Sequence, residues 1–145
     1  MHSKKIFKER AMTLNTLILS NKQKSIYLKN LINKIQSENI FFYLPYSVPE
    51  HNTQQIADLK CWHLLVIDTA TEGFREFAAY FRKRHPMCCL ITITENHNME
   101  KMVFAADIGA WDYLVLPQKD KRYLSFCLKS ALTRINRWFG IKSYR

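Results

Sequence analysis

The stretch Leu64-Leu65-Val66-Ile67-Asp68 sets the interpretation of the whole chain, because four large apolar residues end directly on a carboxylate. A short, continuous apolar run of this kind is typical of a strand that is buried on both faces of a sheet. In open α/β sheets, ligands bind just outside the carboxyl ends of the strands. Asp68 is therefore the first candidate site residue.

Strand-like and helix-like segments alternate on both sides of this run. Further strands are predicted at 13–19, 40–44, 88–94 and 112–116, and helices at 25–37, 74–85, 99–108 and 120–138, with a loop and a short helix within 49–60. This alternation predicts an α/β fold with a parallel sheet covered on both sides. We expect one domain over residues 12–138, a basic N-terminal extension at 1–11 and a basic tail at 139–145.

Composition narrows the class of protein. The chain has 145 residues, of which 48% are hydrophobic, and no apolar run approaches the roughly 18 residues of a membrane span. We expect a cytoplasmic protein. Its four cysteines have no metal-ligand spacing and are expected to be reduced thiols, mostly in the core. The five histidines do not cluster and the three glycines form no phosphate loop, so we expect no enzyme, cofactor or metal.

The net charge of +10 is unevenly distributed along the chain. Residues 1–37 carry eight Lys/Arg and one acid, residues 38–116 carry six and ten, and residues 117–145 carry eight and one. The segment charges are therefore +7, −4 and +7. If the two basic end segments lie close together in the fold, their combined positive potential favours an anionic partner.

Together these units resemble the receiver domain of bacterial response regulators. The run from Gly109 to Pro117, which contains Asp112-Tyr113-Leu114, is similar to the most recognisable motif of that family. The resemblance implies a flavodoxin-like, doubly wound, five-stranded parallel sheet of order 2-1-3-4-5. It also implies that Asp68 matches the phosphoacceptor, and that Thr94 and Tyr113 match the pair that reports phosphorylation.

The chain departs from the receiver pattern at three places that belong to one pocket in that family. Receivers hold magnesium with two acids after the first strand, where this chain has Ser20 and Asn21, or Asn21 and Lys22 in a register shifted by one. They pair the phosphoryl oxygens with a lysine where this chain has Leu116, whose bond to Pro117 matches the family's cis bond without its isomer being set by the sequence. The loop Thr69–Gly73 is also about three residues shorter. Glu72 remains as a possible displaced ligand.

We therefore interpret the chain as a degenerate receiver, a phosphorylation-independent interaction module in a two-component or transcription-regulating system. Its partner would be a protein or a linked output domain. The first alternative is a nucleic-acid-binding accessory protein, and the second is a phosphoacceptor with a rearranged metal site.

Two surfaces follow from this interpretation. Receivers commonly form homodimers and effector contacts through the fourth helix, fifth strand and fifth helix; the matching candidates are Met99, Met102, Phe104, Trp111 and Tyr123. The first and last helices would lie side by side and combine their charges into one basic face bearing Lys22, Lys24, Lys29, Lys34, Lys129, Arg134 and Arg137. Trp138 continues the apolar face of the last helix and is predicted to be core or interface.

Overall fold

The computed structural model describes residues 13–36, 39–44, 53–117 and 120–139, and side chains are described from residue 13 on except those of 39–44 and 53–54. Most of the two predicted terminal extensions lies outside these ranges. The elements are β1 (Leu14–Leu19), α2 (Lys22–Ile35), β2 (Asn39–Leu44), α3 (Thr53–Asp58), β3 (Leu64–Asp68), α4 (Phe74–Arg84), β4 (Cys89–Thr94), α5 (Met99–Asp107), β5 (Asp112–Val115) and α6 (Lys121–Trp138).

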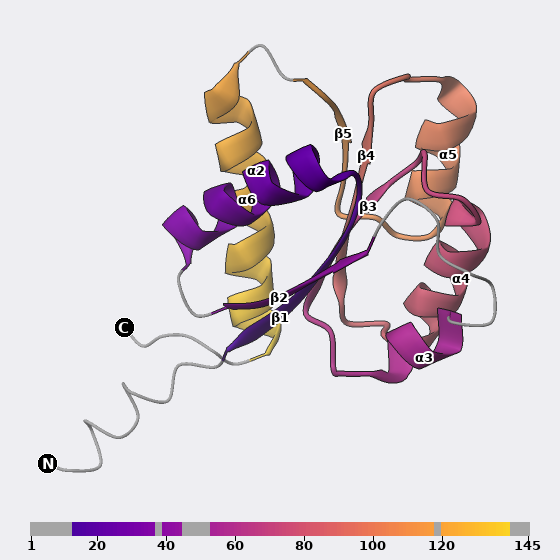
Figure 1. Cartoon of the computed structure of the whole chain (residues 1–145), viewed down its shortest axis with the longest axis horizontal. Helices are drawn as coiled ribbons and strands as arrows, with labels where there is room; N and C mark the ends of the chain where they lie inside the picture. Colours follow the sequence, from indigo (N-terminus) through magenta and orange to yellow (C-terminus); the bar gives the residue numbers. More distant parts are fainter. Residues whose placement is uncertain (1–12, 37–38, 45–52, 118–119, 140–145) are drawn as a thin grey trace, which may run out of the picture.

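The strands form one parallel sheet of order β2-β1-β3-β4-β5. Helices α2 and α6 lie against one face, and α3, α4 and α5 lie against the other (Figure 1). The α/β class with a helix-covered parallel sheet, predicted from the alternation of segments, is confirmed. None of the described helices combines the length and apolar character that crossing a bilayer requires.

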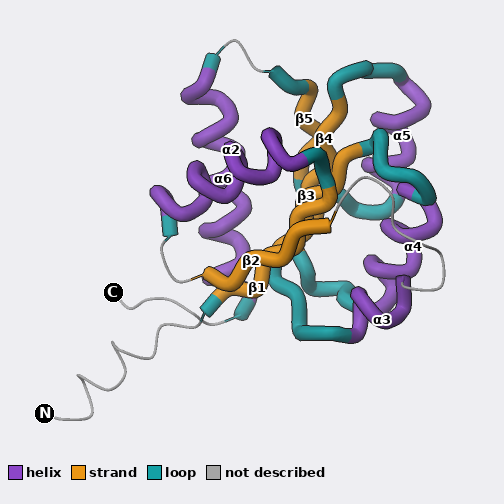
Figure 2. The backbone as a smooth tube through the Cα atoms, viewed as in Figure 1, coloured by secondary structure: helices purple, strands orange, loops and turns teal. Residues whose placement is uncertain are grey.

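Each face of the sheet has its own hydrophobic core. Alternate residues of the central strands point to opposite faces, so Leu64 and Val66 pack with α2 and α6, whereas Leu65 and Ile67 pack with α4. This explains why β3 is apolar at every position before Asp68. Both layers of helices are visible on either side of the strands in the tube view (Figure 2).

The first helix begins earlier than predicted, and this difference matters for the site. It was expected from Ser25, but α2 starts at Lys22 because Asn21 caps it: the Asn21 Oδ1 accepts the Lys24 amide at 2.8 Å. The Asn21 carbonyl also accepts the Ser25 amide at 2.9 Å. Lys24 therefore belongs to the first helical turn, directly beside the carboxyl ends of the strands.

Candidate functional site

Asp68 lies at the end of β3 and is 1% exposed. Its Oδ1 accepts the Ala70 amide at 2.9 Å, and its Oδ2 accepts the Ser20 hydroxyl at 3.0 Å. Ser20 reaches it because β1 and β3 pair in register, Leu19 opposite Ile67, so the residues that follow both strands meet. The structure thus brings together Asp68 and one residue at the position of the missing acids.

A third donor completes the surroundings of this carboxylate. The ammonium of Lys24 lies 3.1 Å from the Asp68 Oδ2, and the Lys24 side chain is only 16% exposed. The same ammonium pairs with Glu95, which follows β4 and remains half exposed. The expectation that Lys24 belongs to the outer basic face is wrong, because the early start of α2 turns this side chain toward the strand ends.

Thr94 is connected to a second lysine. Its Oγ1 accepts a hydrogen bond from the Thr69 hydroxyl at 2.8 Å and another from the Lys101 ammonium at 3.4 Å. Lys101 comes from the first turn of α5 and also donates to the Asn96 carbonyl at 2.8 Å. The described surroundings of Asp68 and Thr94 thus contain two carboxylates, Asp68 and Glu95, and two ammonium groups, those of Lys24 and Lys101.

The side chains around Asp68 do not fit a magnesium ion. Magnesium prefers several hard oxygen ligands in octahedral geometry and is usually held by carboxylates. Here the Asn21 amide oxygen caps a helix, and a cation next to Asp68 would meet the Lys24 ammonium. Within the described ranges, no group of three His, Cys, Asp or Glu side chains is arranged to hold a metal ion.

Tyr113 and Leu116 are the remaining residues matched to the receiver pattern. Tyr113 is half-buried, and its hydroxyl is 2.9 Å from the His97 Nδ1. Leu116 is 6% exposed and packs in the core under α2 and α6, and its bond to Pro117 is cis. The aliphatic side chain at the lysine position is therefore part of the core.

The candidate partner surface lies around β5, the edge strand of the sheet. Its predicted members Met99, Met102, Trp111 and Tyr123 are all exposed, whereas Phe104 packs against the core under α3, α4 and α5. Two exposed residues were missed, Val103 on α5 and Phe126 on α6, the latter 68% exposed. Phe126 lies on the side of α6 opposite the buried residues Leu124, Leu128 and Ile135, and this helical periodicity was the available signal for its exposure.

The predicted basic face is partly altered. Helices α2 and α6 do pack together, and the Asn136 amide donates to the Gln36 Oε1 at 3.4 Å. Lys22, Lys34, Lys129 and Arg137 are exposed on these helices, and Lys29 is half-buried. Arg134, however, lies over two rings, with its guanidinium carbon 4.3 Å from the centre of Trp111 and 3.8 Å from that of Trp138. Trp138, predicted to be core or interface, is 42% exposed and is therefore not a core residue, whereas a role in an interface stays a prediction.

Comparison with known proteins gives structural matches only. No protein-family model matches the chain, and no curated protein matches it in sequence. A signal receiver domain of two-component signal transduction from Clostridium thermocellum superposes with a TM-score of 0.69 at 17% identity, covering 83% of this chain and 98% of that one. A response regulator from Thermotoga maritima gives 0.67 at 14% identity, covering 84% and 99%.

An orphan response regulator of H. pylori is also similar, with a TM-score of 0.60 at 16% identity, over 82% of this chain and 96% of that one. The chain therefore has the fold of response-regulator receiver domains. At such low identities the similarity establishes the fold, and the activity has to be argued from the site.

Proposed function

We propose that this chain is an atypical receiver domain that acts as a regulatory protein-interaction module without phosphorylation of Asp68. The observation that carries the proposal is the ion pair between the Lys24 ammonium and the Asp68 Oδ2, which lie 3.1 Å apart with both side chains largely buried. Both oxygens of Asp68 already accept hydrogen bonds. The carboxylate is therefore poorly placed to attack a phosphoryl donor.

Electrostatics support the same conclusion. Phosphoryl transfer relies on a divalent cation to neutralise the moving group. A +2 ion about 4 Å from the Lys24 ammonium would meet a repulsion of roughly 8 kcal/mol at an effective dielectric constant of about 20. Because Lys24 is part of α2, its ammonium lies beside Asp68 without any ligand having to bind. We infer that it replaces the cation and holds Asp68 in one state.

The proposed partner surface is the exposed apolar set on α5, β5 and α6. Its members are Met99, Met102, Val103, Trp111, Tyr123 and Phe126. Large apolar side chains that remain exposed to solvent on consecutive elements are candidates for interaction sites. The proposed partner is another protein, a linked output domain or a second copy of the chain, and the pairing of Tyr113 with His97 supports one constant shape of this surface.

A titration with beryllofluoride and magnesium, followed by amide NMR, tests the proposal. We expect no saturable shifts at Asp68, Thr94 or Tyr113 at millimolar concentrations, in a series where an active receiver serves as reagent control. Saturable shifts that disappear in Asp68→Asn would overturn the proposal and favour a phosphoacceptor with a rearranged metal site. The Lys24→Met variant is informative in the same series, because its response measures how far the ammonium blocks ligand entry.

Partner binding is tested on the surface itself. Phe126→Ser should weaken self-association measured by light scattering, or capture of a partner, whereas Asp68→Asn should leave it intact. Leu59→Ser is the matched control, because Leu59 is 58% exposed and follows α3, which carries none of the proposed surface residues. Equal effects of the two serine variants, or loss of binding in a folded Asp68→Asn protein, would contradict this function.

Nucleic-acid binding is a second candidate, favoured by one specific observation. Helices α2 and α6 pack together, and neither contains an acidic residue. Binding through this face should weaken steeply with salt because counterions are released from the phosphate backbone. Lys34→Glu combined with Lys129→Glu should abolish it, with Lys83→Glu on α4 as the control. Binding that ignores both salt and the double substitution would exclude this candidate.

A further inference from the structure

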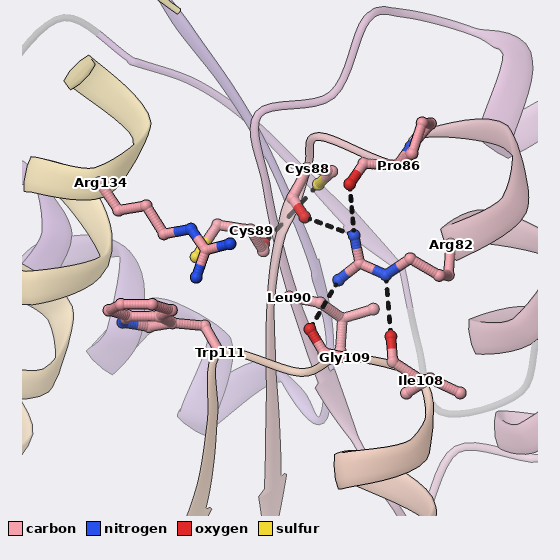
Figure 3. A pocket seen from close by; sticks show the side chains of 9 residues that line it. All are labelled: Arg82, Pro86, Cys88, Cys89, Leu90, Ile108, Gly109, Trp111 and Arg134. Atoms are coloured by element: carbon pink, nitrogen blue, oxygen red, sulfur yellow. Dashed lines mark hydrogen bonds between the residues drawn. The ribbon is translucent and has the colours of Figure 1, made fainter. Parts of the chain in front are cut away.

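A pocket of about 180 Å³ lies at the amino ends of β4 and β5, whereas Asp68 lies at the carboxyl end of β3 (Figure 3). Its lining residues are Arg82, Pro86, Cys88, Cys89, Leu90, Ile108, Gly109, Trp111 and Arg134. The pocket is separate from the Asp68 site and shares Trp111 with the proposed partner surface. At about 30 Å³ per water molecule, its volume corresponds to roughly six waters, the size of a small ligand or of one chemical group.

Arg82 forms one wall of the pocket and is held rigidly. Its Nε donates to the Ile108 carbonyl at 2.9 Å, its Nη1 to the Cys88 carbonyl at 2.8 Å, and its Nη2 to the Gly109 carbonyl at 3.2 Å. Figure 3 shows this guanidinium surrounded by backbone oxygens. These acceptors fix its position, but they carry no formal charge. Among the residues that the structure describes, no carboxylate forms an ion pair with Arg82.

Arg134 forms the facing wall, and its guanidinium lies over the rings of Trp111 and Trp138. A cation–π contact of this kind attracts the guanidinium but does not neutralise its formal charge. Among the described residues, no carboxylate pairs with Arg134 within ion-pair distance. A planar donor that is fixed before binding is well suited to oxygen anions, which it can hold with two parallel hydrogen bonds.

The rest of the lining does not cancel these charges. No acidic residue lines the pocket. Burial raises the pKa of the Cys88 thiol, and it raises the pKa of the Cys89 thiol to about 12, so both sulfurs stay neutral at physiological pH. Asp112 lies next to Trp111 in the chain; its carboxylate accepts the Tyr113 amide at 2.9 Å, and its charge contributes to the raised pKa of Cys89. Asp112 itself does not line the pocket, so the two guanidinium groups are the charged groups of the lining.

We propose that this pocket binds a small oxyanionic group, a phosphate or a carboxylate, through the guanidinium of Arg134 and the fixed charge of Arg82. The size of the pocket fits such a group, and the positive charge of its lining favours an anion. Contacts of Arg134 with two tryptophan rings limit its movement, so less conformational entropy is lost on binding.

The indole N–H signals in ¹H–¹⁵N NMR provide a direct test. Sodium phosphate and sodium acetate are titrated separately at constant ionic strength, with sodium chloride as the balance. We expect saturable shifts of the Trp111 and Trp138 signals, with Trp62 as an internal reference because its buried indole donates to the Ile56 carbonyl at 3.1 Å. The anion that binds more tightly identifies the preferred chemistry.

Variants at two positions of α6 decide the assignment. Arg134→Gln should weaken binding at least about tenfold, the loss of roughly one charged hydrogen bond. Arg134→Lys keeps the charge and should give an intermediate affinity, and it retains a readout should the glutamine variant fold poorly. Arg137→Gln is the control, with the same charge change at an exposed site, and should bind within about twofold of the unmodified protein.

Either of two results would overturn the proposal. The first is a shift of the Trp111 and Trp138 signals that grows linearly or is reproduced by chloride. The second is a phosphate or acetate affinity that is unchanged in both Arg134 variants.

Discussion

The ion pair between Lys24 and Asp68 gives the sharpest quantitative prediction. Replacing Lys24 by methionine keeps most of the apolar stem but leaves the Asp68 carboxylate, 1% exposed, with only the Ser20 hydroxyl and the Ala70 amide as donors. Breaking a buried ion pair by removing one partner costs about 3–5 kcal/mol. Since the Lys24 side chain is 16% exposed, we expect the lower end, about 3 kcal/mol.

Replacing the other partner of the ion pair, Asp68, should destabilise the fold much less. Asp68→Asn removes the buried charge and leaves Lys24 paired with Glu95, so we expect a cost of about 1 kcal/mol, that of one neutral hydrogen bond. If the two effects were independent, the double variant would lose about 4 kcal/mol. Because the double variant contains no uncompensated buried carboxylate, we expect a loss of only about 2 kcal/mol, which is a coupling of about 2 kcal/mol.

Urea unfolding followed by circular dichroism measures all four proteins of this cycle. At this chain length each kcal/mol shifts the melting temperature by about 2–4 °C, so Lys24→Met should melt about 6–12 °C lower. Lys22→Met, on the exposed side of the same helical turn, is the control and should change little. Additive losses in the double variant, or equal losses for the two methionine variants, would refute the reasoning.

Three further outcomes are expected. Arg82→Lys should lower the free energy of unfolding by about 1.5–3 kcal/mol in urea, because lysine cannot reproduce the fork of hydrogen bonds to backbone carbonyls, whereas Arg84→Lys on the surface should not. Native labelling with a thiol reagent at pH 8 should modify Cys61 alone, and the three buried thiols only after unfolding; rapid native labelling of more than one thiol would contradict this packing. Burial lowers the pKa of His63 below 6.5, and its Nδ1 accepts the Asn15 amide. The folded state therefore binds a proton at His63 less readily than the unfolded state does. As the pH drops below 6.5, the free energy of unfolding should decrease by at most about 1.4 kcal/mol per pH unit. His63→Asn should remove this decline, and an unchanged pH profile in that variant would disprove the assignment.

Much of the fold could be predicted from the sequence because its signals are local. The apolar run ending at Asp68, the periodic apolar residues of α4 and α6 and the left-handed Gly109 after α5 each depend on neighbours along the chain. The departures from the receiver pattern were equally local, since Ser20 and Leu116 are identified by their positions after and at the end of strands.

The residues that complete the candidate site could not be predicted in this way. Whether Lys24 points outward or toward Asp68 depends on where α2 begins, and a start at Ser25 instead of Lys22 leaves Lys24 outside the helix. Lys101 reaches Thr94 only because α5 begins beside the end of β4. Such contacts join side chains that are distant in sequence.

The amino-acid sequence by itself therefore determined the α/β class, the carboxylate at the end of β3 and the lack of acids after β1, because hydrophobic periodicity and residue type act within a few positions. The tertiary structure alone decided that Lys24 pairs with Asp68 and that Arg134 lies over the rings of Trp111 and Trp138. Those contacts depend on the register of neighbouring strands and on the rotation of each helix about its axis. Both are fixed only when the helices pack against the sheet.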